Sequence, residues 1–194
     1  SVVLYCPHLN RDVTGLQATI PNLDLYIGEP TPKGEDGCLE GHKSIISSAM
    51  KNGWNRVFVM EDDCEFTRHF SYEKWCEAAD WAQEQGFDVL AGGCTRTYDE
   101  KVVRHTPFVI LEVSAFHSAH CVVYFESGYE KALQAVQPYD WSLGRDCECR
   151  CALVHPFVAV QRQSYSGILR TMVNYVPFYE WHEQELERHL GLQR

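Results

Sequence analysis

Three consecutive acids, Glu61, Asp62 and Asp63, are the residues whose types and spacing point most directly to chemistry. Like charges repel one another, so a fold gains little from placing three acids together unless a cation binds there. Mg²⁺ and Mn²⁺ prefer oxygen ligands and are usually held by one or two carboxylates together with substrate phosphates. The cluster therefore predicts a metal–diphosphate site, with a solvated acidic turn as the alternative.

The segment before the acids predicts how they are positioned. Residues 57–60 form an unbroken apolar run, which is typical of a strand covered on both faces of a sheet. A helix is expected before this strand, beginning near Asp36 as its N-cap and ending at Gly53. Open α/β sheets bind their ligands at the carboxyl ends of such strands, which is where the three acids fall.

Strand-like and helix-like segments alternate along the first half of the chain. This alternation predicts an α/β fold with a mostly parallel central sheet flanked by helices, in one domain over residues 1–194. Residues 28–36 are expected to be a flexible connection and residues 95–107 a mobile loop. Further strands are expected at 1–6, 23–27, 87–91, 108–113, 120–125 and within 152–161, where Pro156 indicates an edge or a sheet exit. Further helices are expected at 13–18, 71–86 with Ser71 as N-cap, 127–136 with a Ser127–Glu130 capping box, from about 139, and 178–190.

Composition narrows the classes of partner. A net charge of −10 without a Lys/Arg run argues against nucleic acid and anionic membrane surfaces. No apolar run approaches the length of a membrane span. Nine cysteines, an odd number, favour reduced thiols over a disulfide framework, so a cytoplasmic location is expected. Two alternatives stay open: a location peripheral to a membrane, and a chain that is a fragment of a larger protein. The oligomeric state is not predicted.

A resemblance to a known family starts from the helix before the acids. This part of the chain consists of Gly37-Cys38-Leu39-Glu40-Gly41-His42, the following helix, and the apolar strand that ends in Glu-Asp-Asp. It resembles the hallmark of the lipopolysaccharide and collagen galactosyltransferases. That family has Gly-Cys-x-x-Ser-His, so Gly41 stands where it usually has Ser. The similarity runs from about residue 1 to about residue 168. Further signatures of the family are resembled by three other parts of the chain: residues 120–133, Pro138-Tyr139-Asp140, and Pro156 with Gln161 and Ser166.

The resemblance implies a GT-A fold and an inverting transfer of a sugar from a nucleotide-sugar donor to an acceptor hydroxyl. The implied donor is a UDP-sugar, either UDP-galactose or UDP-glucose, and the implied cofactor is Mn²⁺ or Mg²⁺. The implied acceptor is a glycan, glycoprotein or glycolipid, as in lipopolysaccharide biosynthesis. Asp63 would bind the metal that bridges the donor diphosphate. Glu61 and Asp62 would face the donor ribose and sugar.

The same resemblance assigns the remaining site residues. Asp140 matches the family's Pro-x-Asp and is the expected base that takes the acceptor's proton, although it could simply cap a helix; Asp146 and Glu148 are the alternatives. The loop after the first strand, with Pro7, Asn10 and Arg11, is expected to line the nucleotide, Arg11 reaching phosphate or lying on the surface.

Histidines and cysteines add weaker candidates. His42 is expected either to hydrogen-bond into the donor site or to be a satisfied core residue. His155 and His182 are candidate further ligands of the catalytic metal. The 147–151 segment, Cys-x-Cys-x-Cys, lacks the paired Cys-x-x-Cys of structural zinc sites, which disfavours zinc there.

Two other functions remain open from the sequence. A metal-dependent nucleotidyltransferase also needs acids at strand ends, but it usually has a basic or Gly-rich phosphate loop, and none is evident. A non-catalytic carbohydrate-binding or scaffold domain could retain the same fold without transfer.

Overall fold

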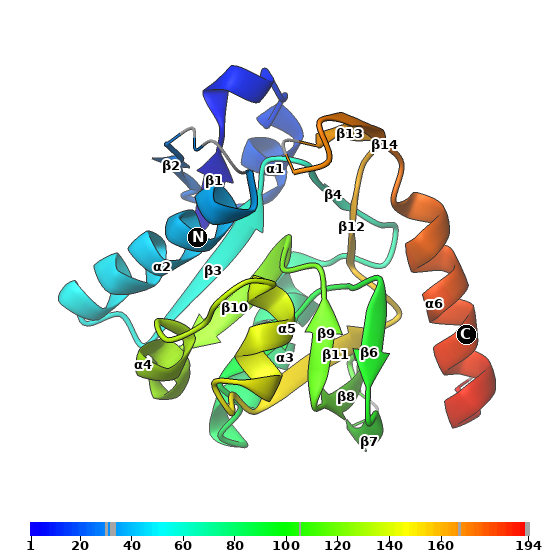
Figure 1. The fold of residues 1–194 in the computed structure, drawn as a ribbon. Helices are drawn as coiled ribbons and strands as arrows, with labels where there is room; N and C mark the ends of the chain where they lie inside the picture. The colour runs from blue at the N-terminus through cyan, green and yellow to red at the C-terminus, as the bar shows by residue number, and fades with distance from the viewer. Residues whose placement is uncertain (30, 32–33, 105, 167, 193–194) are drawn as a thin grey trace.

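The centre of the protein is an eight-stranded sheet with the order β2-β1-β3-β10-β5-β11-β8-β7 (Figure 1). The computed structural model describes residues 1–194 except 30, 32–33, 105, 167 and 193–194. In chain order these strands are β1 (Val2–Tyr5), β2 (Asp24–Ile27), β3 (Arg56–Glu61), β5 (Val89–Ala91), β7 (Lys101–Arg104), β8 (Val109–Val113), β10 (Cys121–Phe125) and β11 (Cys151–His155).

Most strands of the sheet point the same way. β1 pairs in parallel with β2 and β3, and β5 pairs in parallel with β11. β10 is antiparallel to both of its neighbours, β3 and β5, and β8 is antiparallel to β11 and β7. Six of the eight strands therefore share one direction and only β10 and β8 are reversed, which confirms the predicted α/β fold with a mostly parallel central sheet.

Both faces of the sheet are buried, as the apolar run of β3 predicts. Val57 and Val59 pack into one hydrophobic cluster, and Phe58 and Met60 into the other. This split follows from the two-residue period of a strand, which sends successive side chains to opposite faces. Side chains from α2 (Gly34–Lys51), α4 (Tyr129–Ala132), α5 (Tyr139–Arg145) and α6 (Val176–Leu190) join the first cluster, and those of α1 (Thr14–Thr19) and α3 (Tyr72–Glu84) join the second.

Most expected helix boundaries are confirmed. Gly53 and Gly86 end α2 and α3 with φ of +65° and +74°, and Ser71 Oγ accepts a hydrogen bond from the Lys74 amide at 3.4 Å. Helix α2 begins at Gly34, two residues before the expected cap. The expectation of a Ser127–Glu130 capping box is wrong. Ser127 Oγ donates to the Phe87 carbonyl at 3.3 Å, and Gly128 occupies the N-cap of α4.

Short strands outside the main sheet form three pairs, β4 (Cys64–Phe66) with β12 (Ala159–Gln161), β6 (Arg96–Tyr98) with β9 (Ala115–His117), and β13 (Ser164–Ser166) with β14 (Thr171–Val173). The expected mobile loop at 95–107 is therefore wrong for its described residues, since it contains β6 and the edge strand β7. Residue 105, and residues 30, 32 and 33 of the expected 28–36 connection, lie outside the described residues. Pro156 follows β11 where the chain leaves the main sheet, so the expected sheet exit is confirmed.

The terminal helix packs on the body, with Tyr179, His182 and Leu186 buried. The short 3₁₀ helices are η1 (Pro7–Leu9) and η2 (Glu126–Gly128). All nine cysteines belong to the described part of the chain and are free. None of the described helices has the length and apolar character needed to cross a membrane.

Candidate active site

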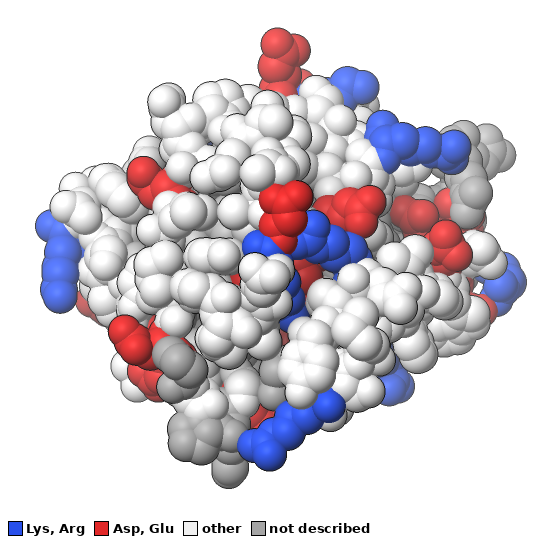
Figure 2. Space-filling model, turned by 90° about the horizontal axis from the view of Figure 1, so that it is seen from above, with Lys and Arg blue, Asp and Glu red and all other residues white. Residues whose placement is uncertain are grey.

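A cavity of about 490 Å³ opens where β1 and β3 end, which is a size typical of small-molecule sites. Figure 2 looks onto this end of the sheet and shows acidic and basic side chains side by side near the middle of the face. Among the described residues that line the cavity, Arg11 is the one Arg or Lys. Six of the described lining residues are acidic: Glu29, Glu35, Glu61, Asp62, Asp63 and Asp140.

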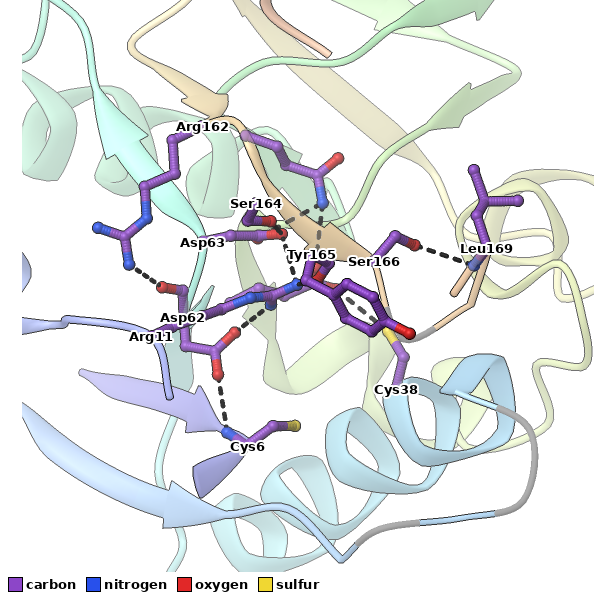
Figure 3. Close-up of polar contacts among 12 residues, drawn as sticks. Cys6, Arg11, Cys38, Asp62, Asp63, Arg162, Ser164, Tyr165, Ser166 and Leu169 are labelled. Carbon is purple, nitrogen blue, oxygen red and sulfur yellow. Dashed lines mark hydrogen bonds and ion pairs between the residues drawn. The ribbon is translucent and has the colours of Figure 1, made fainter. Parts of the chain in front are cut away.

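Asp62 ties the loop after β1 to the end of β3. Its Oδ2 accepts a hydrogen bond from the Cys6 amide at 2.8 Å, and its Oδ1 pairs with the guanidinium of Arg11 (Figure 3). Both oxygens of this buried carboxylate are therefore engaged by the protein. The structure supports a positioning role for Asp62 at the cavity wall.

Arg11 lies inside the acidic cluster, with only 12% of its side chain exposed. Its Nη2 is 3.3 Å from Asp63 Oδ2 and donates to the Tyr165 carbonyl at 2.8 Å. The alternative of a surface arginine is thus wrong. Arg11 supplies part of the positive charge that three adjacent acids require.

Asp63 and Glu61 share an amide donor from a distant strand. Gln161 Nε2 lies 3.3 Å from Glu61 Oε2 and 3.5 Å from Asp63 Oδ1, and Tyr179 Oη donates to Gln161 Oε1 at 3.1 Å. Ser164 Oγ donates to Asp63 Oδ2 at 3.2 Å. Gln161 occurs in the family-like signature without an assigned role, and no signal in the sequence indicates Ser164.

The electrostatics of Asp63 suit a divalent cation. Burial raises the pKa of Asp63 to about 6, and the charge of Glu61 adds to this shift while Arg11 opposes it. Burial and the charge of Glu61 therefore make the ionised form of Asp63 less favourable than that of an exposed carboxylate, and further positive charge would stabilise it. Two neighbouring carboxylates on the cavity wall fit a Mg²⁺ or Mn²⁺ ion that also takes diphosphate oxygens.

Glu61 turns its other oxygen toward helix α2. Cys38 Sγ donates to Glu61 Oε1 at 3.1 Å, and His42 Nε2 lies 3.4 Å from the same oxygen. Burial acts to raise the pKa of Glu61, but the hydrogen bonds from His42 and Cys38 outweigh it and lower that pKa to about 2. His42 is fully buried and does not line the cavity, so it reaches the site only through Glu61.

Gly41 lets α2 approach β1 closely enough for these contacts. A Cβ at Gly41 would lie 2.6 Å from Leu4 Cδ1, a separation that real Cβ atoms essentially never show. The departure from the family's Ser therefore has a packing reason in this chain.

Asp140 lines the same cavity from the first turn of α5. Its Oδ1 accepts from the Trp141 amide at 2.8 Å and its Oδ2 from the Ser118 amide, while 20% of its side chain stays exposed. His117 Nδ1 lies 3.9 Å from Asp140 Oδ1, and the His117 ring stacks on Trp141 with centroids 5.5 Å apart. His117 also lines the cavity, and no motif in the sequence singles it out.

Several expected site residues lie elsewhere. Pro7 begins η1 and Asn10 follows it, and neither lines the cavity, whereas His8 and Leu9 between them do. His155 lies outside the cavity that Asp63 lines, with its Nε2 3.9 Å from Glu187 Oε1 of α6, so the structure does not bring this expected ligand to Asp63. His182 hydrogen-bonds Thr97 Oγ1 at 2.9 Å.

The remaining candidates are also separated from the site. Asp146 and Glu148, the alternative bases, do not line the cavity. Within the described residues, the cysteines at 147, 149 and 151 are not part of any three-residue group with metal-ligand spacing.

Comparison with known proteins shows the fold. No family model and no curated protein matches the chain. The solved structure of A197 from STIV is similar, with a TM-score of 0.55 and 10% identity over 89% of this chain and 92% of that chain. UDP-glucose pyrophosphorylase complexed with UDP-glucose matches with a TM-score of 0.44 and 7% identity over 86% of this chain and 66% of that one. Mannose-1-phosphate geranyltransferase from Thermus thermophilus matches with a TM-score of 0.37 and 13% identity over 73% of this chain and 55% of that one. The likeness to A197 shows a shared overall fold for nearly the full length of both chains.

Proposed function

We propose that this protein is a metal-dependent glycosyltransferase that moves a sugar from a nucleotide-sugar donor to an acceptor hydroxyl. The observation that carries the proposal is that one cavity at the carboxyl ends of β1 and β3 is lined by both Asp63 and Asp140. These are the two residues to which the galactosyltransferase resemblance gives the metal and the base. They lie 77 positions apart in the sequence (140 − 63), so their meeting in one cavity is a property of the fold.

The charge of the cavity supports a metal requirement. A donor diphosphate brings further negative charge to a wall that has six acids and one Arg among its described residues. Asp63 and Glu61 would hold Mn²⁺ or Mg²⁺, which supplies positive charge to the departing nucleoside diphosphate. Arg11, which already contacts Asp63, is placed to pair with the same phosphates.

The chain's own residues also suit the acceptor side. The backbone amides of Ser118 and Trp141 donate to the two carboxylate oxygens of Asp140 and hold its side chain at the cavity wall. His117 beside it is a second group able to take a proton, and the His117 ring is held by stacking on Trp141. We assign Asp140 as the base because the resemblance gives it that role and because its side chain lines the cavity with 20% of its surface exposed, unlike the buried Asp62.

A donor screen tests this proposal. Purified protein is incubated with UDP-, GDP- and CMP-sugars, with Mn²⁺ or with EDTA, and the released nucleotide is identified. Release of UDP that requires Mn²⁺ supports the proposal. Formation of pyrophosphate from a sugar phosphate and UTP instead would assign the chain to nucleotidyl transfer, and donor binding without turnover with any acceptor would assign it to a binding domain.

A further inference from the structure

Helix α2 and strand β3 bring together a second group of metal-ligating atoms. Among the described residues, Cys38 Sγ, His42 Nε2 or Nδ1 and a Glu61 carboxylate oxygen all lie within 4.8 Å of one another. Cys38 and His42 are four residues apart on α2, so both project from one helix face toward the end of β3. This group does not include Asp63.

The two printed spacings to Glu61 lie close to the edges of a small coordination tetrahedron, and the third pair of atoms lies within 4.8 Å. Glu61 Oε1 lies 3.1 Å from Cys38 Sγ and 3.4 Å from His42 Nε2. With Zn–N and Zn–O bonds near 2.1 Å and Zn–S bonds near 2.3 Å, ligand atoms around tetrahedral zinc lie roughly 3.4–3.7 Å apart. Small adjustments of three side chains are therefore enough to place an ion between them.

Neighbouring groups hold the histidine in the required orientation. Tyr124 Oη lies 3.0 Å from His42 Nδ1, and the Tyr139 ring packs on the imidazole with centroids 4.9 Å apart. A hydrogen bond on one ring nitrogen is the usual means of fixing the tautomer and direction of a metal-ligating histidine. Here it leaves Nε2 facing Glu61.

We propose that Cys38, His42 and Glu61 form a binding site for a thiophilic divalent cation of the Zn²⁺ class. A mixed sulfur, nitrogen and oxygen ligand set suits Zn²⁺ and is unlike the all-oxygen sets of Mg²⁺ and Mn²⁺. On binding, the Cys38 thiol loses its proton to solvent, and His42 exchanges its Nε2 proton for one on Nδ1, which then donates to Tyr124 Oη. The hydrogen bonds of Cys38 and His42 to Glu61 are replaced by one bond from each of the three side chains to the ion. Cys38 and Glu61 also line the cavity, so a fourth coordination position would face it and accept water or a ligand oxygen.

This site shares Glu61 with the one proposed for the donor diphosphate but uses the other oxygen of that carboxylate. Glu61 Oε1 faces Cys38 and His42, whereas Glu61 Oε2 faces Gln161 and, through it, Asp63. The two oxygens of one carboxylate thus point to two sites (Figure 3 shows Cys38 and Asp63 on different sides of the cluster). The proposal does not depend on the transfer reaction.

Cobalt titration of the full chain tests the proposal without an activity assay. Protein stripped with a chelator under reducing conditions is titrated with Co²⁺, and thiolate-to-cobalt charge transfer is followed by absorbance. We expect a saturable band that Zn²⁺ abolishes. The band should be lost in Cys38→Ser and retained in Cys147→Ser, which removes a cysteine that does not line the cavity. Tyr124→Phe is expected to weaken Co²⁺ binding roughly 10-fold.

Folding of the variants is checked by the effect of Zn²⁺ on thermal unfolding. Zn²⁺ should raise the unfolding temperature of wild type and of Asp63→Asn, but not of Cys38→Ser or His42→Gln. A thiolate band that persists in Cys38→Ser, or a wild type that gives no band, overturns the proposal and leaves these residues as a hydrogen-bonded cluster. If Asp63→Asn retains the thiolate-to-cobalt band but has no sugar transfer activity, cation binding at Cys38, His42 and Glu61 is independent of the proposed transferase function.

Discussion

Arg11 Nη2 lies 3.3 Å from Asp63 Oδ2, although the two residues are 52 positions apart in the sequence (63 − 11). The same guanidinium pairs with Asp62, so one cation is shared by two of the three adjacent acids. Arg11 therefore stabilises the cluster, but the raised pKa of Asp63 shows that this compensation is incomplete.

Removal of the guanidinium should destabilise the fold. Because Arg11→Ala leaves two buried carboxylates without their partner, we expect the free energy of unfolding to fall by about 3 kcal/mol in EDTA, measured by urea denaturation. Mn²⁺ should restore part of this loss, since it replaces the missing positive charge. Arg145→Ala, which breaks an exposed pair with Asp99, should cost less than about 1 kcal/mol. Equal losses in the two variants would contradict the buried role of Arg11.

The approach of α2 to β1 can be tested by a substitution at position 41. Gly41→Ser places a Cβ against Leu4, and we expect a loss of about 1–3 kcal/mol in the free energy of unfolding. Gly15→Ser is the matched control, because no atom lies within 4 Å of a Cβ built at that helical glycine. A Gly41→Ser protein as stable as the control would show that the Leu4 side chain can move aside and that this packing does not require glycine.

The stability of the protein should depend on pH through buried His120. Burial lowers the pKa of His120 to about 4, so the folded imidazole stays neutral between about pH 6.5 and 4 while the unfolded one gains a proton. The unfolded state thus binds more protons in this window, and His120 contributes a loss on the order of 3 kcal/mol as the pH falls through it.

The measurement is the difference between wild type and His120→Asn in urea unfolding across that range. Wild type should lose stability on acidification more steeply than the variant, and this comparison cancels the opposite contribution of Asp63. His189→Gln, at an exposed position of α6, should follow wild type. Parallel curves for wild type and His120→Asn would contradict the assignment.

The base can be identified from two conservative variants. Asp140→Asn retains the shape of the side chain but removes its negative charge, so kcat should fall by roughly 10²–10⁴-fold with little change in donor KM. His117→Gln should have the smaller effect on kcat. The reverse order would make His117 the base and Asp140 the residue that orients it.

The sequence predicts what is encoded locally. The apolar run of β3, the acids at its end and the glycines that end α2 and α3 are short-range patterns, and the structure has each of them where it was expected. The prediction of a loop at 95–107 is wrong because the structure of this segment depends on long-range pairing. Its strands β6 and β7 are stabilised by pairing with β9 and β8, partners that local polarity does not reveal.

The partners of the acids could not be predicted because they come from far along the chain. Gln161 and Ser164 contact Glu61 and Asp63 across sequence separations of 98 to 101 residues. His117 meets Asp140 through the packing of α5 on β9. The family-like signature contained Gln161, but only the fold shows which atoms it contacts.

Turnover of UDP-galactose and UDP-glucose by wild type and Asp63→Asn, each with Mn²⁺ and with EDTA, tests the central claim most directly. Asp80→Asn, which changes an exposed acid of α3, is the matched control. We predict Mn²⁺-dependent UDP release by wild type and Asp80→Asn, and a loss of about 100-fold or more in Asp63→Asn with the fold intact. Release that continues at the wild-type rate in Asp63→Asn, or in EDTA, would contradict a metal-dependent transferase site at Asp63.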